Sequence, residues 1–101
     1  MDRQFCVYIL ANKRNGTLYI GVTGDLVTRI CQHKNGEIAG FTKKYGIKTL
    51  VHYEMYDSAR ETIEREKQLK PWKRKWKLEL IEKENPTWKD LYFGLIKNPG
   101  L

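Results

Sequence analysis

An arginine and a histidine stand four residues apart in the segment LVTRICQH, which the sequence predicts to be helical. Leu26 and Ile30 form the apolar row that should face the core. Arg29 and His33 form the next row, about 60° round the helix. A guanidinium beside a buried row can bind phosphate oxygens with its planar fork, and it never deprotonates. The spacing equally allows a solvated flank on which the arginine stem covers apolar surface.

A carboxylate occupies an apolar position of a later predicted helix. Ala59, Ile63, Glu66 and Leu69 follow one another at spacings of 4, 3 and 3 residues, so Glu66 should face the core. An unpaired buried carboxylate is costly, so we expect an arginine, a lysine or a metal cation opposite it. Lys70, four residues further on, is the simplest partner.

Two tyrosines lie in the strand-like segments FCVYILA and TLYIGVT, which are joined by a turn containing Asn15-Gly16. Opposed residues of an antiparallel pair share a face, so a connecting loop of even length places Tyr8 and Tyr19 on one face with Gly21 beside them. An odd loop or a bulge separates them. Tyrosine is common in strands and glycine can simply mark a bulge, so this pair alone does not indicate a site.

The whole chain, residues 1–101, is predicted to form one α+β domain with a small antiparallel sheet of about three strands flanked by helices. Residues 81–101 are expected to pack back on its body. The predicted elements are a hairpin over residues 5–22, a helix capped by Thr23 or Asp25 and ended by Gly36, a loop over 37–46, a strand in IKTLVHYEMY, a helix from the Ser58–Glu61 capping box to about Lys70, a helix after Pro71 to Glu84, and a last helical turn or two in NPTWKDLYFGL.

The charge favours a polyanionic partner, because nineteen Lys and Arg outnumber twelve Asp and Glu and the formal net charge is +7. The stretch from Ala59 to Lys77 contains eight basic residues and three glutamates, so its net charge is +5. Two tryptophans share this stretch, although tryptophans near a helix more often anchor a core. We expect nucleic-acid phosphates to contact its basic residues, namely Lys67, Lys70, Lys73, Arg74, Lys75 and Lys77.

Several classes of protein are disfavoured by the composition. No apolar run approaches the ~20 residues that cross a bilayer, so no membrane partner is expected. The N-terminus has no signal-peptide pattern. Cys6 and Cys31 form no CxxC pair and are too few for a zinc site or a disulfide scaffold. A cytoplasmic protein with reduced thiols is expected.

Taken together, VYI (7–9), YIG (19–21), LVTRICQH (26–33) and the later AR…REKQLK with Glu66 resemble the GIY-YIG nuclease superfamily. The resemblance is to its small stand-alone branch, similar to the nuclease domain of the UvrC excision protein, and it spans about residues 5–80. It implies a small antiparallel sheet flanked by helices. It also implies hydrolysis of phosphodiester bonds with one divalent ion, Mg²⁺ or Mn²⁺.

The resemblance assigns roles to individual residues. Tyr8 and Tyr19 match the motif tyrosines, with Tyr8 as general base, and Arg29 matches the catalytic arginine. His33 stands where the family has tyrosine or histidine and would, like Tyr19, orient the water or relay a proton. Glu66 matches the metal-binding glutamate. Since an unperturbed phenol has a pKa of about 10, we expect nearby positive charge to assist Tyr8.

Three further positions bear on this resemblance. Gly21 would clear room for a phosphate or its water beside the Tyr19 ring. Cys6 stands where the family has the first glycine of its motif. Asn85 is a candidate for the family's downstream asparagine, and capping a helix is its alternative role.

The predicted function is therefore a metal-dependent endonuclease whose partner is nucleic acid, with DNA favoured over RNA. A non-catalytic nucleic-acid-binding module on the same fold is the alternative. An RNA-binding domain of unrelated fold would need the two tyrosines on opposite faces of the sheet. The sequence does not indicate the oligomeric state.

Overall fold

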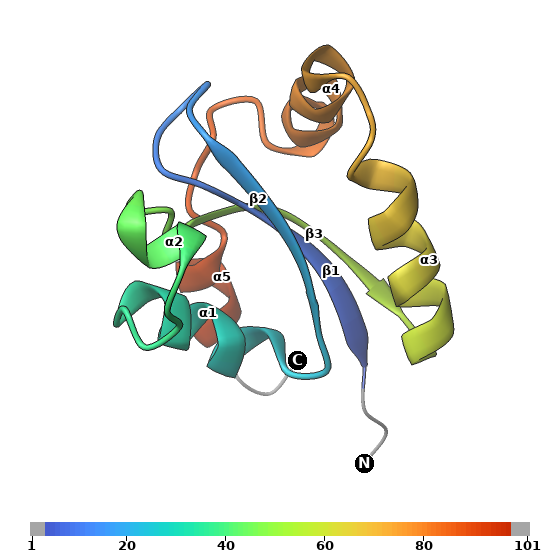
Figure 1. Cartoon of the computed structure of the whole chain (residues 1–101), viewed down its shortest axis with the longest axis horizontal. Helices are drawn as coiled ribbons and strands as arrows, with labels where there is room; N and C mark the ends of the chain where they lie inside the picture. The colour runs from blue at the N-terminus through green and yellow to red at the C-terminus, as the bar shows by residue number, and fades with distance from the viewer. Residues whose placement is uncertain (1–3, 98–101) are drawn as a thin grey trace.

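The computed structural model describes residues 4–97. Its centre is a three-stranded antiparallel sheet of β1 (Phe5–Ala11), β2 (Leu18–Thr23) and β3 (Thr49–Tyr56) in the order β2-β1-β3 (Figure 1). Every residue of β1 after Phe5 is buried, because this strand lies between two others and is covered on both faces. Its near-continuous apolar sequence is typical of such a strand. The prediction of a small α+β fold is confirmed.

Helices cover the two faces of the sheet separately. In Figure 1, α1 (Leu26–Lys34), α2 (Phe41–Lys44) and α5 (Tyr92–Lys97) lie to the left of the sheet. The helices α3 (Ala59–Leu69) and α4 (Arg74–Glu84) lie to its right. Alternating side chains of β1 therefore enter two cores. Tyr8 and Leu10 pack with Leu26 and Ile30 of α1. The other core is formed chiefly by Val7, Ile9, Ala11, Ile20, Val51, Leu69, Ile81 and Trp88.

The predicted turn and cap residues lie where the sequence indicates. Asn15 adopts a positive φ of 57° in the hairpin loop, and Gly36 does so, at 69°, just after α1. The Asp25 side chain caps α1 by accepting a hydrogen bond from the Thr28 amide. Ser58 caps α3 by accepting one from the Glu61 amide.

The described residues after α4 pack against the body, and residues 98–101 of the predicted packing segment lie outside the described residues. Trp88 is only 6% exposed in the core between the sheet and α3. The carboxylate of Asp90 accepts hydrogen bonds from Lys34 Nζ at 2.5 Å and from the amides of Leu50 and Tyr92. Asp90 thereby joins α1, β3 and α5.

Three predicted details are wrong. Residues 37–46, expected to be a loop, contain the short helix α2, and α4 begins at Arg74 rather than just after Pro71. The buried residues of α3 are Thr62 and Leu69, whereas Ala59 is exposed and Ile63 is 43% exposed. Thr62 can be buried because its hydroxyl donates to the Ser58 carbonyl at 2.9 Å, which satisfies the polar group.

Within residues 4–97, no helix is both long and apolar enough to cross a membrane.

Candidate active site

The two tyrosines of the hairpin lie on the same face of the sheet. Six residues, 12–17, connect the strands, so the register pairs Tyr8 with Gly21 and Leu10 with Tyr19. Opposed residues share a face, which confirms the prediction made for an even loop. The Tyr8 ring lies directly over Gly21, where a Cβ atom would be 2.5 Å from the phenol oxygen and 2.6 Å from Cζ. Gly21 therefore makes room for the phenol of Tyr8 itself.

The phenol of Tyr8 contacts the imidazole of His33. Tyr8 Oη lies 3.0 Å from His33 Nε2, and His33 Nδ1 lies 3.0 Å from the Thr42 hydroxyl. Tyr8 is 1% exposed, His33 3% and Thr42 4%. The Tyr19 ring completes a cluster of three rings, with centroids 6.3 Å from Tyr8 and 5.7 Å from His33. The spacing predicted that His33 would lie at the margin of the buried row of α1, whereas the structure places it in the interior.

Burial controls the protonation of this chain of groups. It raises the pKa of Tyr8 well above its ordinary value, and Tyr19 and Glu66 add to the rise while Arg29 opposes it. The expected lowering by positive charge is thus outweighed. Burial and the Arg29 charge both lower the pKa of His33 below 6.5, so the imidazole is neutral at pH 7. A neutral imidazole donates from one nitrogen and accepts at the other, so it can link the Tyr8 and Thr42 hydroxyls in either of two directions.

Arg29 lies one helical turn before His33 on α1 and is half-buried. Its guanidinium lies close enough to influence the pKa of both Tyr8 and His33. Among the residues that the structure describes, the Arg29 guanidinium has no hydrogen-bond or ion-pair partner. Its donors remain available to an anion at this place.

Glu66 projects from α3, and its charge also reaches Tyr8. Its Oε2 lies 3.4 Å from Lys70 Nζ, so the pair that the sequence allowed is present. The contact is loose, because the Lys70 side chain is 56% exposed and that of Glu66 is 18% exposed. The structure records no hydrogen bond between them among the described residues. A pair whose lysine is largely exposed contributes ~0–1 kcal/mol and can open readily.

The donor set restricts the kind of metal site that is possible. The described part of the chain contains no group of three or more His, Cys, Asp or Glu side chains able to hold an ion. A closed protein cage is therefore excluded for residues 4–97. A single carboxylate suits Mg²⁺, which keeps several waters and commonly binds one or two carboxylates together with substrate phosphates. Glu66 supplies one such carboxylate once it parts from Lys70.

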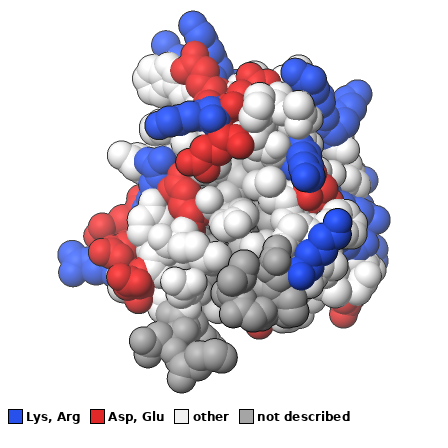
Figure 2. Space-filling view, turned by 180° about the vertical axis from the view of Figure 1, so that it is seen from behind, with Lys and Arg blue, Asp and Glu red and all other residues white. Residues whose placement is uncertain are grey.

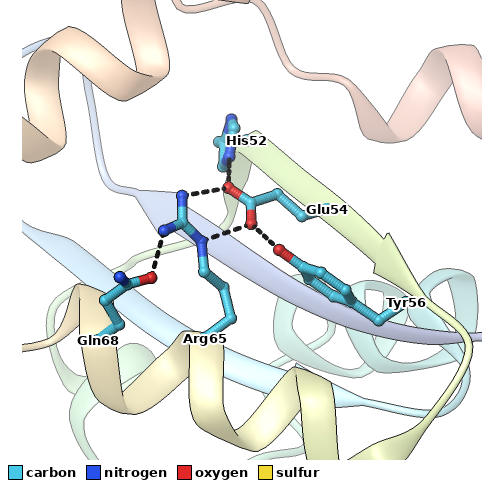
Figure 3. A network of polar contacts seen from close by, with 5 residues as sticks. All are labelled: His52, Glu54, Tyr56, Arg65 and Gln68. Carbon is cyan, nitrogen blue, oxygen red and sulfur yellow. Dashed lines mark hydrogen bonds and ion pairs between the residues drawn. The ribbon is translucent and has the colours of Figure 1, made fainter.

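A polar network that the sequence did not reveal lies next to Glu66. The strand β3 presents His52, Glu54 and Tyr56 to the face that α3 covers, where they oppose Ile9, Val7 and Phe5 of β1 respectively. Figure 3 shows His52 and Tyr56 of β3 and Arg65 of α3 all meeting Glu54, while Gln68 of α3 contacts Arg65. A polar residue at every second position of an otherwise apolar strand was the available signal.

Glu54 is the centre of this network. Its carboxylate accepts two hydrogen bonds from Arg65, at 2.8 and 3.2 Å, one from Tyr56 at 2.7 Å, and contacts His52 at 2.8 Å (Figure 3). Burial opposes ionisation, but these hydrogen bonds outweigh it and hold the pKa of Glu54 well below its ordinary value. Both oxygens are occupied, so Glu54 is a structural carboxylate. Because Arg65 precedes Glu66, the network also restrains the rotation of α3 that orients Glu66.

The basic block is not one free surface. Arg74 donates to the carbonyls of Asn15 and Gly16 in the hairpin loop, at 2.6 and 2.7 Å, and Lys77 donates to the Lys70 carbonyl. Within residues 4–97, the side chains of Lys67, Lys73 and Lys75 have no hydrogen bond or ion pair, although Lys73 Nζ lies over the Trp76 ring. These three lysines remain the most available to phosphate.

Basic side chains also gather elsewhere. Figure 2 shows Lys and Arg along its right-hand margin, which corresponds to the α1–α2 side of Figure 1, whereas Asp and Glu gather at the upper centre and left. An open hollow of about 610 Å³ lies between the hairpin loop and α4, where Lys13, Arg74 and Lys77 line it. None of the five candidate catalytic and metal-binding residues lines this hollow.

Asn85 lies at the end of α4 and is 5% exposed. Its Nδ2 donates to the carbonyls of Val51 and Lys89, and its Oδ1 accepts from the Lys89 amide. All of these partners are in the backbone, so the side chain holds the turn after α4 against β3. Asn85 does not cap the last helix, as the sequence allowed, because α5 begins at Tyr92 and the Asn85 side chain instead holds the turn after α4.

Comparisons with known proteins identify the family of this chain. The model of the GIY-YIG catalytic domain matches residues 4–79, and the chain belongs to this family, which is one of nucleases. A UPF0213 protein of Staphylococcus saprophyticus is 40% identical over 81 residues, which cover 80% of this chain and 96% of that protein. A UPF0213 protein of Staphylococcus aureus is 38% identical over 82 residues, 81% of this chain and 98% of its own length.

A solved structure shows the same fold. The solution NMR structure of the UPF0213 protein BH0048 from Bacillus halodurans has a TM-score of 0.54 and is 29% identical. The match covers 86% of this chain and 92% of that one. The relatives are small proteins matched along nearly their whole length.

Proposed function

We propose that this protein is a metal-dependent endonuclease that hydrolyses phosphodiester bonds of nucleic acid. The observation that carries the proposal is the 3.0 Å contact between Tyr8 Oη and His33 Nε2, with Arg29 and Glu66 both close enough to act on the same phenol. Hydrolysis of a phosphodiester requires a water to lose a proton, charge on the phosphoryl oxygens to be relieved, and a leaving oxygen to be stabilised. The site offers one group for each task.

Tyr8 and His33 would act together as the base. A standing phenolate is unfavourable because burial raises the pKa of Tyr8, whereas neutral His33 can accept the phenol proton at Nε2 while its Nδ1–H donates to Thr42. Tyr8 Oη would then take a proton from the attacking water as its own proton passes to His33. The water oxygen forms the new bond to phosphorus and the bond to the leaving oxygen breaks. Tyr19, with its ring against both groups, would orient the water.

Arg29 and Glu66 would handle the charge. The guanidinium of Arg29 would bind two phosphoryl oxygens and neutralise the charge that grows on them. Glu66 would hold one Mg²⁺ or Mn²⁺ ion, whose chemistry is to stabilise negative charge on the leaving oxygen. The Glu66 carboxylate must leave Lys70 to do so, which the loose 3.4 Å contact permits.

The test is cleavage of labelled DNA and RNA in the presence of Mg²⁺ or Mn²⁺. We expect chelation to abolish cleavage and Arg29→Ala and Glu66→Ala each to reduce it at least ~100-fold. Glu64→Ala is the matched control, because its side chain is 64% exposed on the same helix, and it should cleave like wild type. Equal activity in all variants would identify a contaminating nuclease and reject the proposal.

The Glu66–Lys70 contact favours a second candidate, a nucleic-acid-binding module without catalysis. If the lysine keeps the carboxylate from an ion, the chain would bind nucleic acid with a strong salt dependence and form no metal-dependent product. Under the enzyme proposal, Lys70→Ala should retain cleavage. Salt-dependent binding without a product in both wild type and Lys70→Ala would establish the module instead.

A further inference from the structure

Two aromatic rings, one at the start of α2 and one at its C-terminal cap, are exposed side by side. Phe41 is 48% exposed and Tyr45 49% exposed, and their ring centroids are 4.9 Å apart. They are spaced i,i+4, so they lie on one side of this short helix. Neither ring belongs to either core cluster. The packing of the fold therefore gives no reason for this pair.

The helix that carries the two rings is fixed to the candidate active site. Thr42, which follows Phe41, is buried and contacts His33 Nδ1, and His33 in turn contacts Tyr8. The Ile47 amide donates to the Thr42 carbonyl at 2.9 Å, and Ile47 is fully buried. The rings are thus held on a rigid support adjoining the residues proposed to act on the water.

The surroundings of the rings are basic. Residues 40–48 contain three lysines, Lys43, Lys44 and Lys48, and no acidic residue. All three lysines are exposed, and Lys44 Nζ lies 5.3 Å from the centre of the Tyr45 ring. The ligand that suits such a surface is both anionic and aromatic.

An unpaired nucleotide has these two properties. Its base presents a flat face that stacks on aromatic side chains, and its phosphate pairs with lysine. In a continuous duplex the base faces are covered by neighbouring base pairs, so an aromatic platform gains nothing from them. Stacking of this kind contributes ~1–3 kcal/mol per base and tolerates any base sequence.

We propose that Phe41 and Tyr45 form a stacking platform for unpaired bases next to the scissile bond, so that the substrate is a nucleic acid with a single-stranded segment. This inference rests on the proposed function for the position of the scissile bond. The stacking of bases on the rings needs no divalent ion. Binding can therefore be tested separately from the proposed cleavage.

The experiment measures binding by fluorescence anisotropy without divalent ions. The three labelled ligands are a 12-nucleotide oligo(dT), a 12-nucleotide oligo(U) and a blunt duplex of 12 base pairs. We expect the single strands to bind more tightly than the duplex. The double variant Phe41→Ala/Tyr45→Ala should lose ~10-fold or more in affinity for single strands, with a change of less than ~3-fold for the duplex. Phe41→Trp/Tyr45→Trp should retain the preference. The two single-strand arms distinguish DNA from RNA.

Phe93→Ala is the matched control, because Phe93 is 51% exposed, lies beside another ring and has a lysine over it, but belongs to α5. It should bind single strands like wild type, and circular dichroism should show every variant folded. Equal affinity of wild type for duplex and single strands would overturn the proposal, as would an equal loss in the Phe93 variant. Single-strand binding that depends on Phe41 and Tyr45 would support it even if no nucleic acid is cleaved.

Discussion

The phenol of Tyr8 occupies the space that a side chain at position 21 would fill. The two residues are directly paired across the hairpin, and a Cβ atom on Gly21 would lie 2.5 Å from the Tyr8 oxygen and 3.1 Å from the Tyr19 ring. The glycine in the strand thereby lets a buried tyrosine of β1 extend over β2 to meet His33. This relationship joins the hairpin to α1 at the proposed catalytic base.

Gly21→Ala should therefore damage both stability and the site. The added methyl group would displace the Tyr8 phenol, and we expect a loss of ~1–3 kcal/mol in the free energy of unfolding, as for overpacked cores. Cleavage should fall ~100-fold or more if the Tyr8–His33 contact is required. Urea denaturation and cleavage assays at a temperature where the variant is folded measure the two effects.

Gly94→Ala is the control for this substitution. A Cβ atom on Gly94, within α5, would meet nothing within 4 Å, so alanine should leave cleavage unchanged and stabilise the helix by up to ~1 kcal/mol. Wild-type stability of Gly21→Ala would show that Tyr8 does not need the space over position 21.

Acid should destabilise the protein through His33. Its pKa is lowered in the folded state by burial and by Arg29, while the unfolded chain has the ordinary value of 6.5. The unfolded state then binds more protons below that pH, so the stability present above pH 6.5 is lost as the pH falls through and below it. Urea denaturation from pH 8 to 5 measures this slope.

The variant His33→Gln removes the titrating group, and its stability should change less over the same pH range. The comparison depends on the slope, so any constant loss from the substitution does not affect it. The Tyr8 phenol that contacts the imidazole does not change charge in this range, because burial raises its pKa. Identical slopes in the two proteins would show that His33 is not held neutral by the fold.

Glu54→Gln should be the most destabilising change of a carboxylate in the described part of the chain. It removes the charge that pairs with Arg65, whose side chain is 22% exposed, and leaves the guanidinium with a weaker partner. We expect a loss of ~2–4 kcal/mol in the free energy of unfolding, near the range for a broken buried pair. Thermal and urea denaturation at pH 7 measure it.

The same substitution at Glu64 is the control. Glu64 pairs with Arg60 on the surface of α3, where the side chains are 64% and 89% exposed, so Glu64→Gln should cost less than ~0.5 kcal/mol. Similar losses in the two variants would mean that the network in Figure 3 does not hold α3 to the sheet.

The sequence by itself determined most of the helices and strands, although not α2, and the side of the sheet on which several side chains lie. Local chemistry controls these features: Asn15 accepts a positive φ, and Asp25 and Ser58 supply cap oxygens. An even loop places Tyr8 and Tyr19 on one face, because side chains alternate along a strand. The row of Leu26 and Ile30 faces the core as predicted.

Only the tertiary structure decided how deep each group lies and which partner it meets. Thr62 is buried in place of Ile63 because its hydroxyl finds the Ser58 carbonyl. The pKa of Tyr8 rises because packing removes water from the phenol, and the positive charge of Arg29 is too weak to offset this effect. Alternating polar residues along β3 indicate a polar face, but the pairing of Glu54 with Arg65 depends on how β3 and α3 pack together. Desolvation and pairing across elements depend on three-dimensional packing, and local sequence patterns do not encode them.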